Sequence, residues 1–431
     1  MHHGFITESL PWVSPLAVAA ELTRNEACFV FLYSGLQSVQ SGRYSLLALH
    51  AQETVSGSSF SAFTQSSDNR HIFDNAWFGY LGYELLHDIE NIKHEQASYI
   101  TLPDLWLAKF GLIILFDHEA KSVISFRAPH IPLPQWHEYA APAPVTLPEV
   151  TSLASPMSRE QYLAIIEKTV EAIRRGDFYQ ANITRKFTGT FAITPDRFAL
   201  FTRLCEVSPA SYSALICIDD HAIISSSPEC FLTISSEGCM ESRPIKGTAP
   251  RFTDKETDNN ARESLSNSVK DRAENMMIVD LMRNDFARSC EPGSVKVEKL
   301  FEIISYATVH HMVSTVTGRK RKGVSTLEAV KSCFPPGSMT GAPKVKAMQW
   351  CMENEKIRRG IYSGALGWFG GDGSCNLSVI IRTLITEGTR FEFQVGGGIV
   401  ADSEPEKEWQ ETIAKARGIM TTLGIKTCEF Q

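Results

Sequence analysis

The sequence predicts a layered fold of the α/β or α+β class, and three features support this prediction. Stretches rich in β-branched and aromatic residues recur along the chain, as is typical of strands in a sheet. Between them lie longer segments whose apolar residues repeat every three or four positions, as in amphipathic helices. At 431 residues the chain exceeds one typical core, so we expect two cores or one large layered core.

The composition argues against several classes of protein. A net charge of -7 argues against nucleic-acid binding, which requires a basic excess. The longest apolar run, residues 110–116, is too short to span a membrane, and the first five residues lack the pattern of a secretory signal. The 10 cysteines contain no C-x-x-C pair, which is typical of reduced thiols. We therefore expect a cytoplasmic enzyme without a nucleic-acid or membrane partner.

Three parts follow one another along the chain. Residues 1–127 are strand-rich, with strands expected at residues 28–33, 110–117 and 122–126. Residues 128–156 contain seven prolines, too many for a helix or a central strand, and predict a connection. Residues 157–431 then form the third part.

The third part opens with a helix and a strand of mixed polarity. Ser158 and Gln161 form a capping box, and Gly176 is expected to end the helix. In the strand expected at residues 178–187, the polar side chains of Gln180, Asn182 and Thr184 share one face, which either meets solvent or lines a pocket. Further strands are expected at residues 222–226, 230–234, 378–384 and 391–395.

A helix expected at residues 267–285 carries two carboxylates on one face. Asp271 and Glu274 are three residues apart, and Ile278 and Leu281 continue their face, which argues against a fully solvated surface.

A second helix with paired carboxylates is expected to begin after Ser403, with Glu406 as its capping-box partner, and to run past residue 417. Glu408, Glu411 and Lys415 share one stripe of it. Two such helices can build a Mg²⁺ site, because this ion takes one or two carboxylates together with waters and substrate oxygens. On spacing alone, the alternative is a solvated helix face.

Two glycine-containing motifs also bear on function. Lys246 lies between Pro244 and Gly247, on a bend that would hold its amine at one point. Three consecutive glycines at residues 396–398 allow an anion to approach the backbone. Residues 337–344 resemble a P-loop, but Ala342-Pro343 stands where Lys-[Ser/Thr] is required. No glutaminase, serine hydrolase or zincin motif is present.

Several motifs occur together in one order, and in this order they resemble the chorismate-utilising enzymes. The matching segments are residues 227–229, 243–251, 271–285, 309–314, 334–344, 381–383 and 396–403. The resemblance covers roughly residues 157–424 and extends more weakly into the N-terminal third. It implies a large layered β-sandwich flanked by helices, of the anthranilate synthase component I type, with residues 157–431 as the chorismate-binding catalytic domain. Residues 41–45 resemble the family's tryptophan-pocket region.

The same resemblance implies roles for individual residues. Lys246 is the expected covalent nucleophile, Glu229 the acid that protonates the departing C4 hydroxyl, and His311 a neighbour of that hydroxyl. Glu274 and Glu411 are the expected Mg²⁺ ligands, with Asp271 and Glu408 nearby. The expected contacts to the substrate's anionic groups are Gly247, Thr248, Tyr362, Arg382, Gly396, Gly397, Gly398 and Lys415.

Two positions distinguish the reactions within this family. Members that add water are expected to carry a lysine base where this chain has Gln180, and anthranilate synthases typically carry alanine in place of Lys246. The resemblance therefore implies amination of chorismate at C4, with ammonia from a separate glutamine amidotransferase subunit. The alternatives are anthranilate synthase component I and a catalytically idle homologue that binds chorismate or tryptophan. Cys230 departs from the family's frequent arginine, and we expect little effect on the chemistry.

Overall fold

The computed structural model describes residues 4–36, 41–65, 71–90, 92, 96–306 and 309–425. The helices are α1 Pro15–Leu22, α2 Arg159–Arg175, α3 Arg197–Val207, α4 Lys255–Asn267, α5 Val269–Ser289, α6 Thr326–Cys333, α7 Lys344–Glu355 and α8 Pro405–Thr422. Short 3-10 turns are η1 Phe60–Ala62, η2 Tyr83–Asp88 and η3 Gly337–Met339.

The strands form an extensive, mostly antiparallel sheet system. They are β1 Ile6–Leu10, β2 Cys28–Tyr33, β3 Tyr44–Gly57, β4 Trp77–Leu81, β5 Leu105–Asp117, β6 Ser122–Arg127, β7 Val150–Ala154, β8 Gln180–Phe191, β9 Tyr212–Ile218, β10 His221–Ser227, β11 Cys230–Ile234, β12 Cys239–Ser242, β13 Ile245–Pro250, β14 Lys296–Ser305, β15 Val309–Arg319, β16 Gly341–Ala342, β17 Ala365–Phe369, β18 Cys375–Val379, β19 Thr383–Glu387 and β20 Arg390–Ile399.

Strands from the first 127 residues pair with strands from much later in the chain. β2 pairs antiparallel with β9, and β4 pairs antiparallel with β17. β7 lies within the proline-rich connection and pairs with β8. The division into three parts stays a prediction, and the hydrogen-bonded sheet runs across its boundaries.

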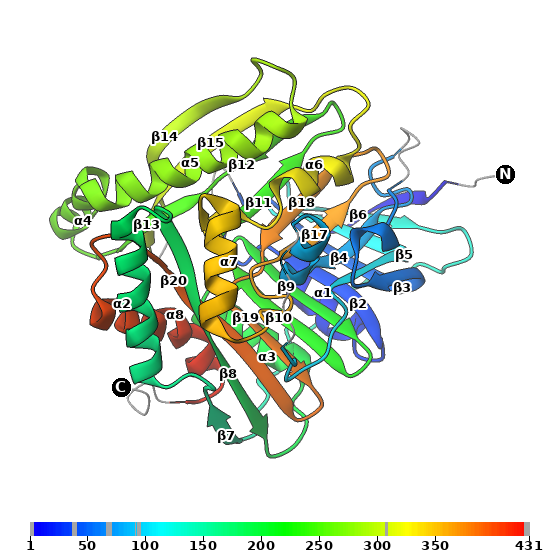
Figure 1. The fold of residues 1–431 in the computed structure, drawn as a ribbon. Coiled ribbons are helices and arrows are strands. Elements are labelled where there is room, and N and C mark those ends of the chain that lie inside the picture. Colours follow the sequence, from blue (N-terminus) through cyan, green and yellow to red (C-terminus); the bar gives the residue numbers. More distant parts are fainter. Residues whose placement is uncertain are drawn as a thin grey trace.

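Helices cover the outside of this sheet system and complete the core. α4 and α5 lie along β14 and β15, whereas α2, α7 and α8 pack near β8 and β20 (Figure 1). One apolar cluster contains the fully buried side chains of Val30, Phe78 and Ile113 from early strands and Ile216 from β9, because these strands face the same core. The predicted α+β class, a layered β-sandwich flanked by helices, is confirmed.

Local predictions succeeded where a short-range signal decides the structure. Ser158 and Gln161 form the capping box of α2, and Gly176 ends this helix with φ 88°. One predicted strand was wrong: residues 378–384 divide between β18 and β19, because Arg382 adopts φ 50° between them.

The predicted capping box of α8 was also wrong. Glu404 is the N-cap, without a side-chain cap, and Pro405 occupies the first turn. The Ser403 hydroxyl instead donates to Glu408 at 2.7 Å and accepts from the backbone N–H of Val400.

None of the helices in the described ranges is long and apolar enough to cross a membrane. The prediction about the first five residues falls partly on residues 1–3, which lie outside the described residues. A cytoplasmic location stays a prediction.

Candidate active site

The side chain of Lys246 lies close to residues of two other strands, β8 and β20. It is in β13, at an irregularity in the pairing of β13 with β15. A Cβ at Gly398 of β20 would lie 3.3 Å from Nζ of Lys246 and 2.5 Å from Nε2 of Gln180 on β8. Glycine at position 398 therefore leaves the room that both side chains occupy.

The surroundings of Lys246 lower the pKa of its amine. The side chain is half-buried, and burial lowers its pKa below the ordinary value. The nearby ammonium of Lys415 lowers this pKa further, whereas the carboxylates of Glu274, Glu229 and Glu411 oppose the shift. A neutral, nucleophilic amine is thus more accessible here than on an exposed lysine.

Glu229 is a buried carboxyl group immediately before β11, with 7% of its surface exposed. Burial raises its pKa to about 7, despite the opposing effects of the Ser338 hydroxyl, Lys246 and the Ile245 backbone N–H. A carboxyl group with this pKa retains a substantial protonated fraction at neutral pH. Glu229 is therefore suited to act as a general acid.

Arg382 lies near Glu229, and His311 lies near Arg382. Oγ1 of Thr248 and Nδ1 of His311 are 3.1 Å apart. Burial, together with the positive charge of Arg382, lowers the pKa of His311 to about 4, so its ring is neutral at pH 7. Burial lowers the pKa of Arg382 as well, while Glu229 partly restores it. His311 and Arg382 line a cavity of about 190 Å³.

The carboxylates of α8 surround Gly397. A Cβ at this position would lie 3.1 Å from Oε2 of Glu408 and 3.5 Å from Oε1 of Glu411. Glu408 is buried, burial raises its pKa, and its Oε2 has no hydrogen-bond partner among the described residues. Burial also acts to raise the pKa of Glu411, but the ion pair with Lys415 at 2.7 Å holds it below the ordinary value. Nζ of Lys415 also donates to the Gly396 carbonyl at 2.8 Å.

The carboxylates of α5 approach from the opposite direction. Burial raises the pKa of Glu274, and the negative charge of Glu411 raises it further, whereas Lys246 lowers it. Lys270 lies 3.8 Å from Glu274. A Cβ at Gly247, which has φ 82°, would lie 2.9 Å from Cγ of Asp271. One carboxylate from each predicted pair, Glu274 on α5 and Glu411 on α8, thus lies near the same lysine.

The four carboxylates predicted to bind Mg²⁺ lie on α5 and α8 as two pairs. Within the part of the chain that the structure describes, no three His, Cys, Asp or Glu side chains gather closely enough to hold a metal ion. Mg²⁺ needs only one or two direct carboxylates. The unpartnered Oε2 of buried Glu408, which would lie 3.1 Å from a Cβ at Gly397, fits an ion bound at this point.

Two further observations qualify the predicted set. Tyr362 is buried, and burial raises the pKa of its hydroxyl, which the nearby charge of Arg359 partly opposes; its contact with substrate stays a prediction. Sequence reasoning missed Ser338, which lies near Glu229 and acts to lower its pKa. The available signal was its place in residues 334–344, one of the segments that carry the family resemblance.

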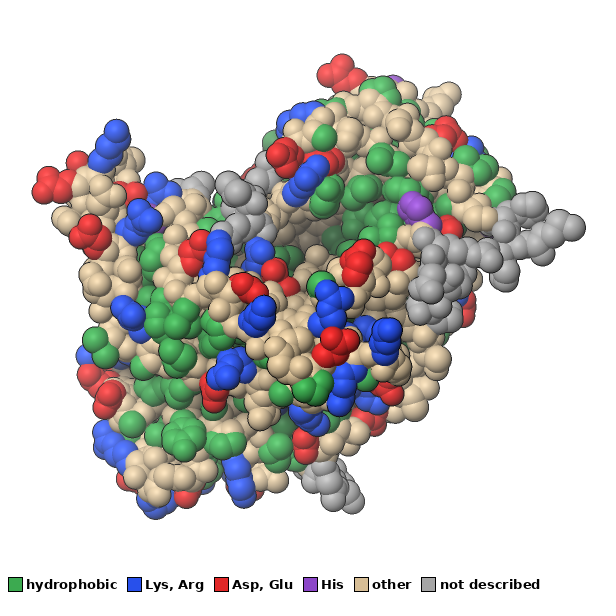
Figure 2. Space-filling model, turned by 90° about the horizontal axis from the view of Figure 1, so that it is seen from above, with side chains coloured by type: hydrophobic (Ala, Val, Ile, Leu, Met, Phe, Trp, Pro, Cys, Tyr) green, Lys and Arg blue, Asp and Glu red, His purple; other side chains and the backbone are tan. Residues whose placement is uncertain are grey.

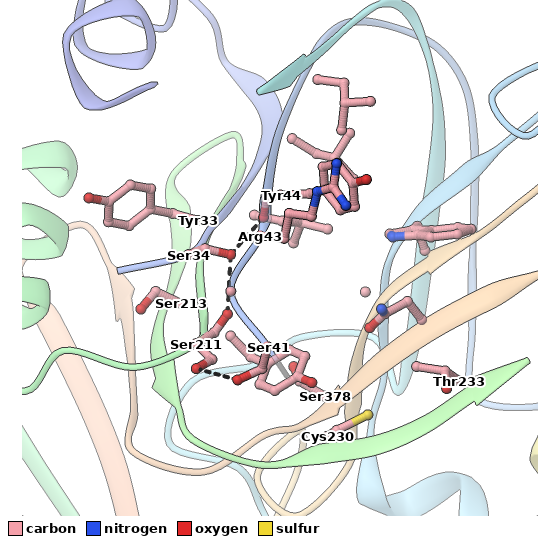
Figure 3. A pocket seen from close by; sticks show the side chains of 18 of the residues that line it. Tyr33, Ser34, Ser41, Arg43, Tyr44, Ser211, Ser213, Cys230, Thr233 and Ser378 are labelled. Atoms are coloured by element: carbon pink, nitrogen blue, oxygen red, sulfur yellow. Dashed lines mark hydrogen bonds between the residues drawn. The ribbon is translucent and has the colours of Figure 1, made fainter. Parts of the chain in front are cut away.

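A larger cavity of about 1100 Å³ lies outside this site, between N-terminal strands and β9, β11, β17 and β18. Figure 3 shows Arg43 and Tyr44 on one side of it and Ser41, Cys230 and Ser378 on another. The Ser41 hydroxyl donates to that of Ser211 at 3.0 Å. Seen from above, the molecular surface is hollowed, with hydrophobic side chains in the hollow and charged side chains around it (Figure 2). The predicted pocket region at residues 41–45 therefore does border a cavity.

The layered sheet and the lysine–carboxylate site define the class of protein. A family model described as chorismate binding enzyme matches residues 26–421, and the chain belongs to this family. The resemblance inferred from the motifs is confirmed.

Individual relatives show where in the family the similarity lies. The chain is 37% identical over 392 residues to aminodeoxychorismate synthase component 1 of Klebsiella aerogenes, covering 88% of this chain and 86% of the relative. It is 39% identical over 278 residues to anthranilate synthase component 1 of Aquifex aeolicus, covering 64% and 56%. The crystal structure of anthranilate synthase component I from Streptococcus pneumoniae superposes with a TM-score of 0.75 at 26% identity, covering 89% and 93%.

Proposed function

We propose that this protein aminates chorismate with ammonia to give 4-amino-4-deoxychorismate, in the pathway to 4-aminobenzoate and folate. The similarity to aminodeoxychorismate synthase component 1 over most of both chains supports this reaction. The observation that carries the proposal is the neighbourhood of Lys246, Gln180 and Glu229, which provides a nucleophilic amine, an acid, and glutamine at the position where members that add water are expected to carry a lysine base.

The proposed reaction has two steps on this chain's residues. The amine of Lys246 forms a bond to a ring carbon while the C4–O bond breaks, and Glu229 gives its proton to the departing hydroxyl, which leaves as water. Ammonia then forms the C4–N bond, the Lys246–carbon bond breaks, and a proton from ammonia returns to the site. The sum is chorismate plus ammonia giving product plus water.

The remaining residues orient the substrate. Arg382 is placed to pair with a carboxylate, because its planar guanidinium suits bidentate binding, and Thr248 and neutral His311 lie beside it. Glu274 and Glu411, with Asp271 and Glu408, would hold Mg²⁺, which when bound neutralises and fixes a substrate carboxylate. A separate glutamine amidotransferase subunit would supply the ammonia.

The test combines product analysis with mass spectrometry. Protein incubated with chorismate, ammonium and Mg²⁺ should form 4-amino-4-deoxychorismate, and chorismate without ammonia should leave a covalent adduct on Lys246. Lys246→Ala should form no adduct, whereas Lys299→Ala, a change at an exposed lysine, should behave as wild type. Release of pyruvate and anthranilate would instead identify an anthranilate synthase. Full activity of Lys246→Ala without any adduct would exclude the covalent step.

A further inference from the structure

One charged side chain lies in the apolar layer between α8 and the sheet. In the register of β8 with β20, Arg185 pairs with Val395 and Ile183 pairs with Gly397, the glycine beside the carboxylates of α8. Side chains of directly paired residues share a face of the sheet, and so do those two residues apart along a strand. This face therefore carries Ala181, Ile183, Arg185 and Phe187 from β8, and Val395, Gly397 and Ile399 from β20. Arg185 is the charged residue in this set.

The guanidinium of Arg185 is buried without a full set of acceptors. The side chain is 2% exposed, and its Nε and Nη1 have no hydrogen-bond partner among the described residues. Burial lowers the pKa of Arg185 to about 10, so the group stays charged at neutral pH. A buried charge that is not fully hydrogen-bonded destabilises the folded state. An uncharged side chain of similar length would avoid this penalty, so the guanidinium must contribute something else.

The guanidinium contacts two aromatic rings. Its Cζ lies 3.7 Å from the ring centroid of Trp409 on α8 and 4.5 Å from that of Phe187 on β8. A cation over the face of a tryptophan ring is attracted by the ring's quadrupole, most strongly when both groups are out of water. Trp409 is buried and also contacts Tyr162 of α2, with the ring centroids 5.7 Å apart. Trp409 is thus held by contacts from the sheet and from α2.

Trp409 lies in the turn of α8 that carries the predicted metal ligands. Glu408 precedes it directly and Glu411 follows two residues later, and both carboxylates lie beside Gly397 of β20. The strand partner of Arg185, Val395, is two residues from this glycine. Arg185 therefore contacts α8 next to the place where the two carboxylates meet the sheet. A change in the packing of Trp409 would move both carboxylates together.

We propose that Arg185 is a positioning residue, whose contact with Trp409 fixes the turn of α8 that bears Glu408 and Glu411 and thereby sets the affinity for Mg²⁺. The inference rests on the proposed function only in assigning these carboxylates to the metal. Groups that orient metal ligands from outside the coordination shell typically change metal affinity by about 10- to 100-fold when they are removed. A guanidinium suits this task because it is planar and stacks on an aromatic face, whereas an ammonium is a compact point charge.

Bound Mn²⁺ reports this affinity without turnover. Electron paramagnetic resonance measures free Mn²⁺ during titration of the full-length, substrate-free protein, and competition gives the Kd of Mg²⁺. Glu411→Gln should weaken binding and so identifies the site. Arg185→Met keeps the length of the side chain, removes its charge and plane, and should raise the Kd of both ions by about tenfold. Its melting temperature should stay the same or rise, because an incompletely hydrogen-bonded buried charge is removed.

Two further variants separate positioning from a general effect of charge. Arg185→Lys keeps the charge without the plane, and its loss of affinity should be smaller than that of Arg185→Met. The double variant Arg185→Met/Trp409→Leu should bind metal no more weakly than Trp409→Leu alone, because Arg185 is proposed to act through Trp409.

Two controls match these changes away from the site. Arg390→Met removes an arginine whose Cζ lies 5.6 Å from the ring centroid of Tyr99, at the opposite end of β20. Phe78→Leu reduces packing in a different apolar cluster and should lower the melting temperature. Both variants should keep the wild-type Kd.

Unchanged metal affinity in Arg185→Met would overturn the inference, as would losses that simply add in the double variant. An equal loss of affinity in Phe78→Leu would also overturn it, because reduced stability would then explain the effect. Unchanged binding in Glu411→Gln would do the same, since the metal would lie elsewhere. Failure of the proposed function would look different: the metal affinities would change as described while chorismate and ammonia gave anthranilate and pyruvate.

Discussion

Two lysines of this protein occupy similar sequence contexts and opposite chemical environments. Lys246 follows Pro244 and precedes Gly247, and Lys344 follows Pro343 in a glycine-containing motif. Lys344 gives all three of its donors to Asp285 and two backbone carbonyls. Lys246 faces the α-carbon of Gly398 and the amide of Gln180, and burial lowers its pKa.

The difference shows what separates a structural lysine from a chemical one. Three acceptors stabilise the charged ammonium of Lys344 and hold it in place. Lys246 lies near carboxylates, but these do not hold its amine as the three acceptors hold that of Lys344. The amine of Lys246 occupies room that exists only because position 398 is glycine. The proline–glycine context constrains the backbone in both cases, and the acceptors decide the role.

The largest expected effect is on activity at Lys246. Lys246→Met should reduce kcat/KM for amination by about a thousandfold, the scale seen when a catalytic nucleophile is removed. The melting temperature should stay the same or rise, because burial disfavours the charged amine that is removed. Steady-state kinetics and thermal unfolding of the same preparation check both. A variant with activity within tenfold of wild type would place Lys246 with Lys344 as a structural lysine.

The reverse pattern is expected at Lys344, where stability is lost. Lys344→Met should lower the free energy of unfolding by about 3–5 kcal/mol, because buried Asp285 loses its counter-ion. Adding Asp285→Asn should recover part of this loss. Urea unfolding curves measure both variants, and a loss below about 1 kcal/mol for the single variant would contradict a buried ion pair.

A smaller effect on activity is expected at Glu229, the proposed general acid. Glu229→Gln should reduce kcat/KM by about a hundredfold, within the range for general acid catalysis. In the wild type, the slope of log kcat/KM against pH should fall by one near pH 7, since Glu229 loses its proton there. The variant should lack this break. A wild-type profile without a change of slope between pH 6 and 8 would rule out Glu229 as the acid.

The smallest expected effect comes from narrowing the gap at Lys246. Gly398→Ala places a methyl group 2.5 Å from Nε2 of Gln180 and 3.3 Å from Nζ of Lys246, and should reduce kcat/KM by about tenfold. Gly4→Ala is the matched control, since its Cβ would meet Asp74 at an ordinary 3.4 Å. Equal activity of the two variants would show that Gln180 and Lys246 do not depend on this gap.

Features fixed by neighbouring residues were predictable from the sequence. The capping box and terminal glycine placed both ends of α2, and helical spacing brought the carboxylates of α5 and α8 toward one site. The motifs also placed the chain in its family before any coordinates were considered.

Features that depend on distant partners or local backbone geometry were not predictable. Ser338 lies near Glu229 despite a long sequence separation, and no periodic pattern encodes such proximity. The apolar run at residues 378–384 resembles one strand, but a positive φ at Arg382 divides it. Ser403 satisfies the capping pattern, yet its hydroxyl binds buried Glu408, where an unpartnered carboxylate would cost more than an uncapped helix end.

The pairing of β2 with β9 and of β4 with β17 has a consequence for how this gene can change. Replacement of the part before residue 127 or 156 would remove strands that hydrogen-bond to later strands. The later strands would then be exposed sheet edges, which favour aggregation. Recombination therefore cannot exchange the first third of this protein as an independent module. The early strands β2 and β4 must be inherited together with their later partners β9 and β17, and mutations in the early strands are selected in the context of these partners.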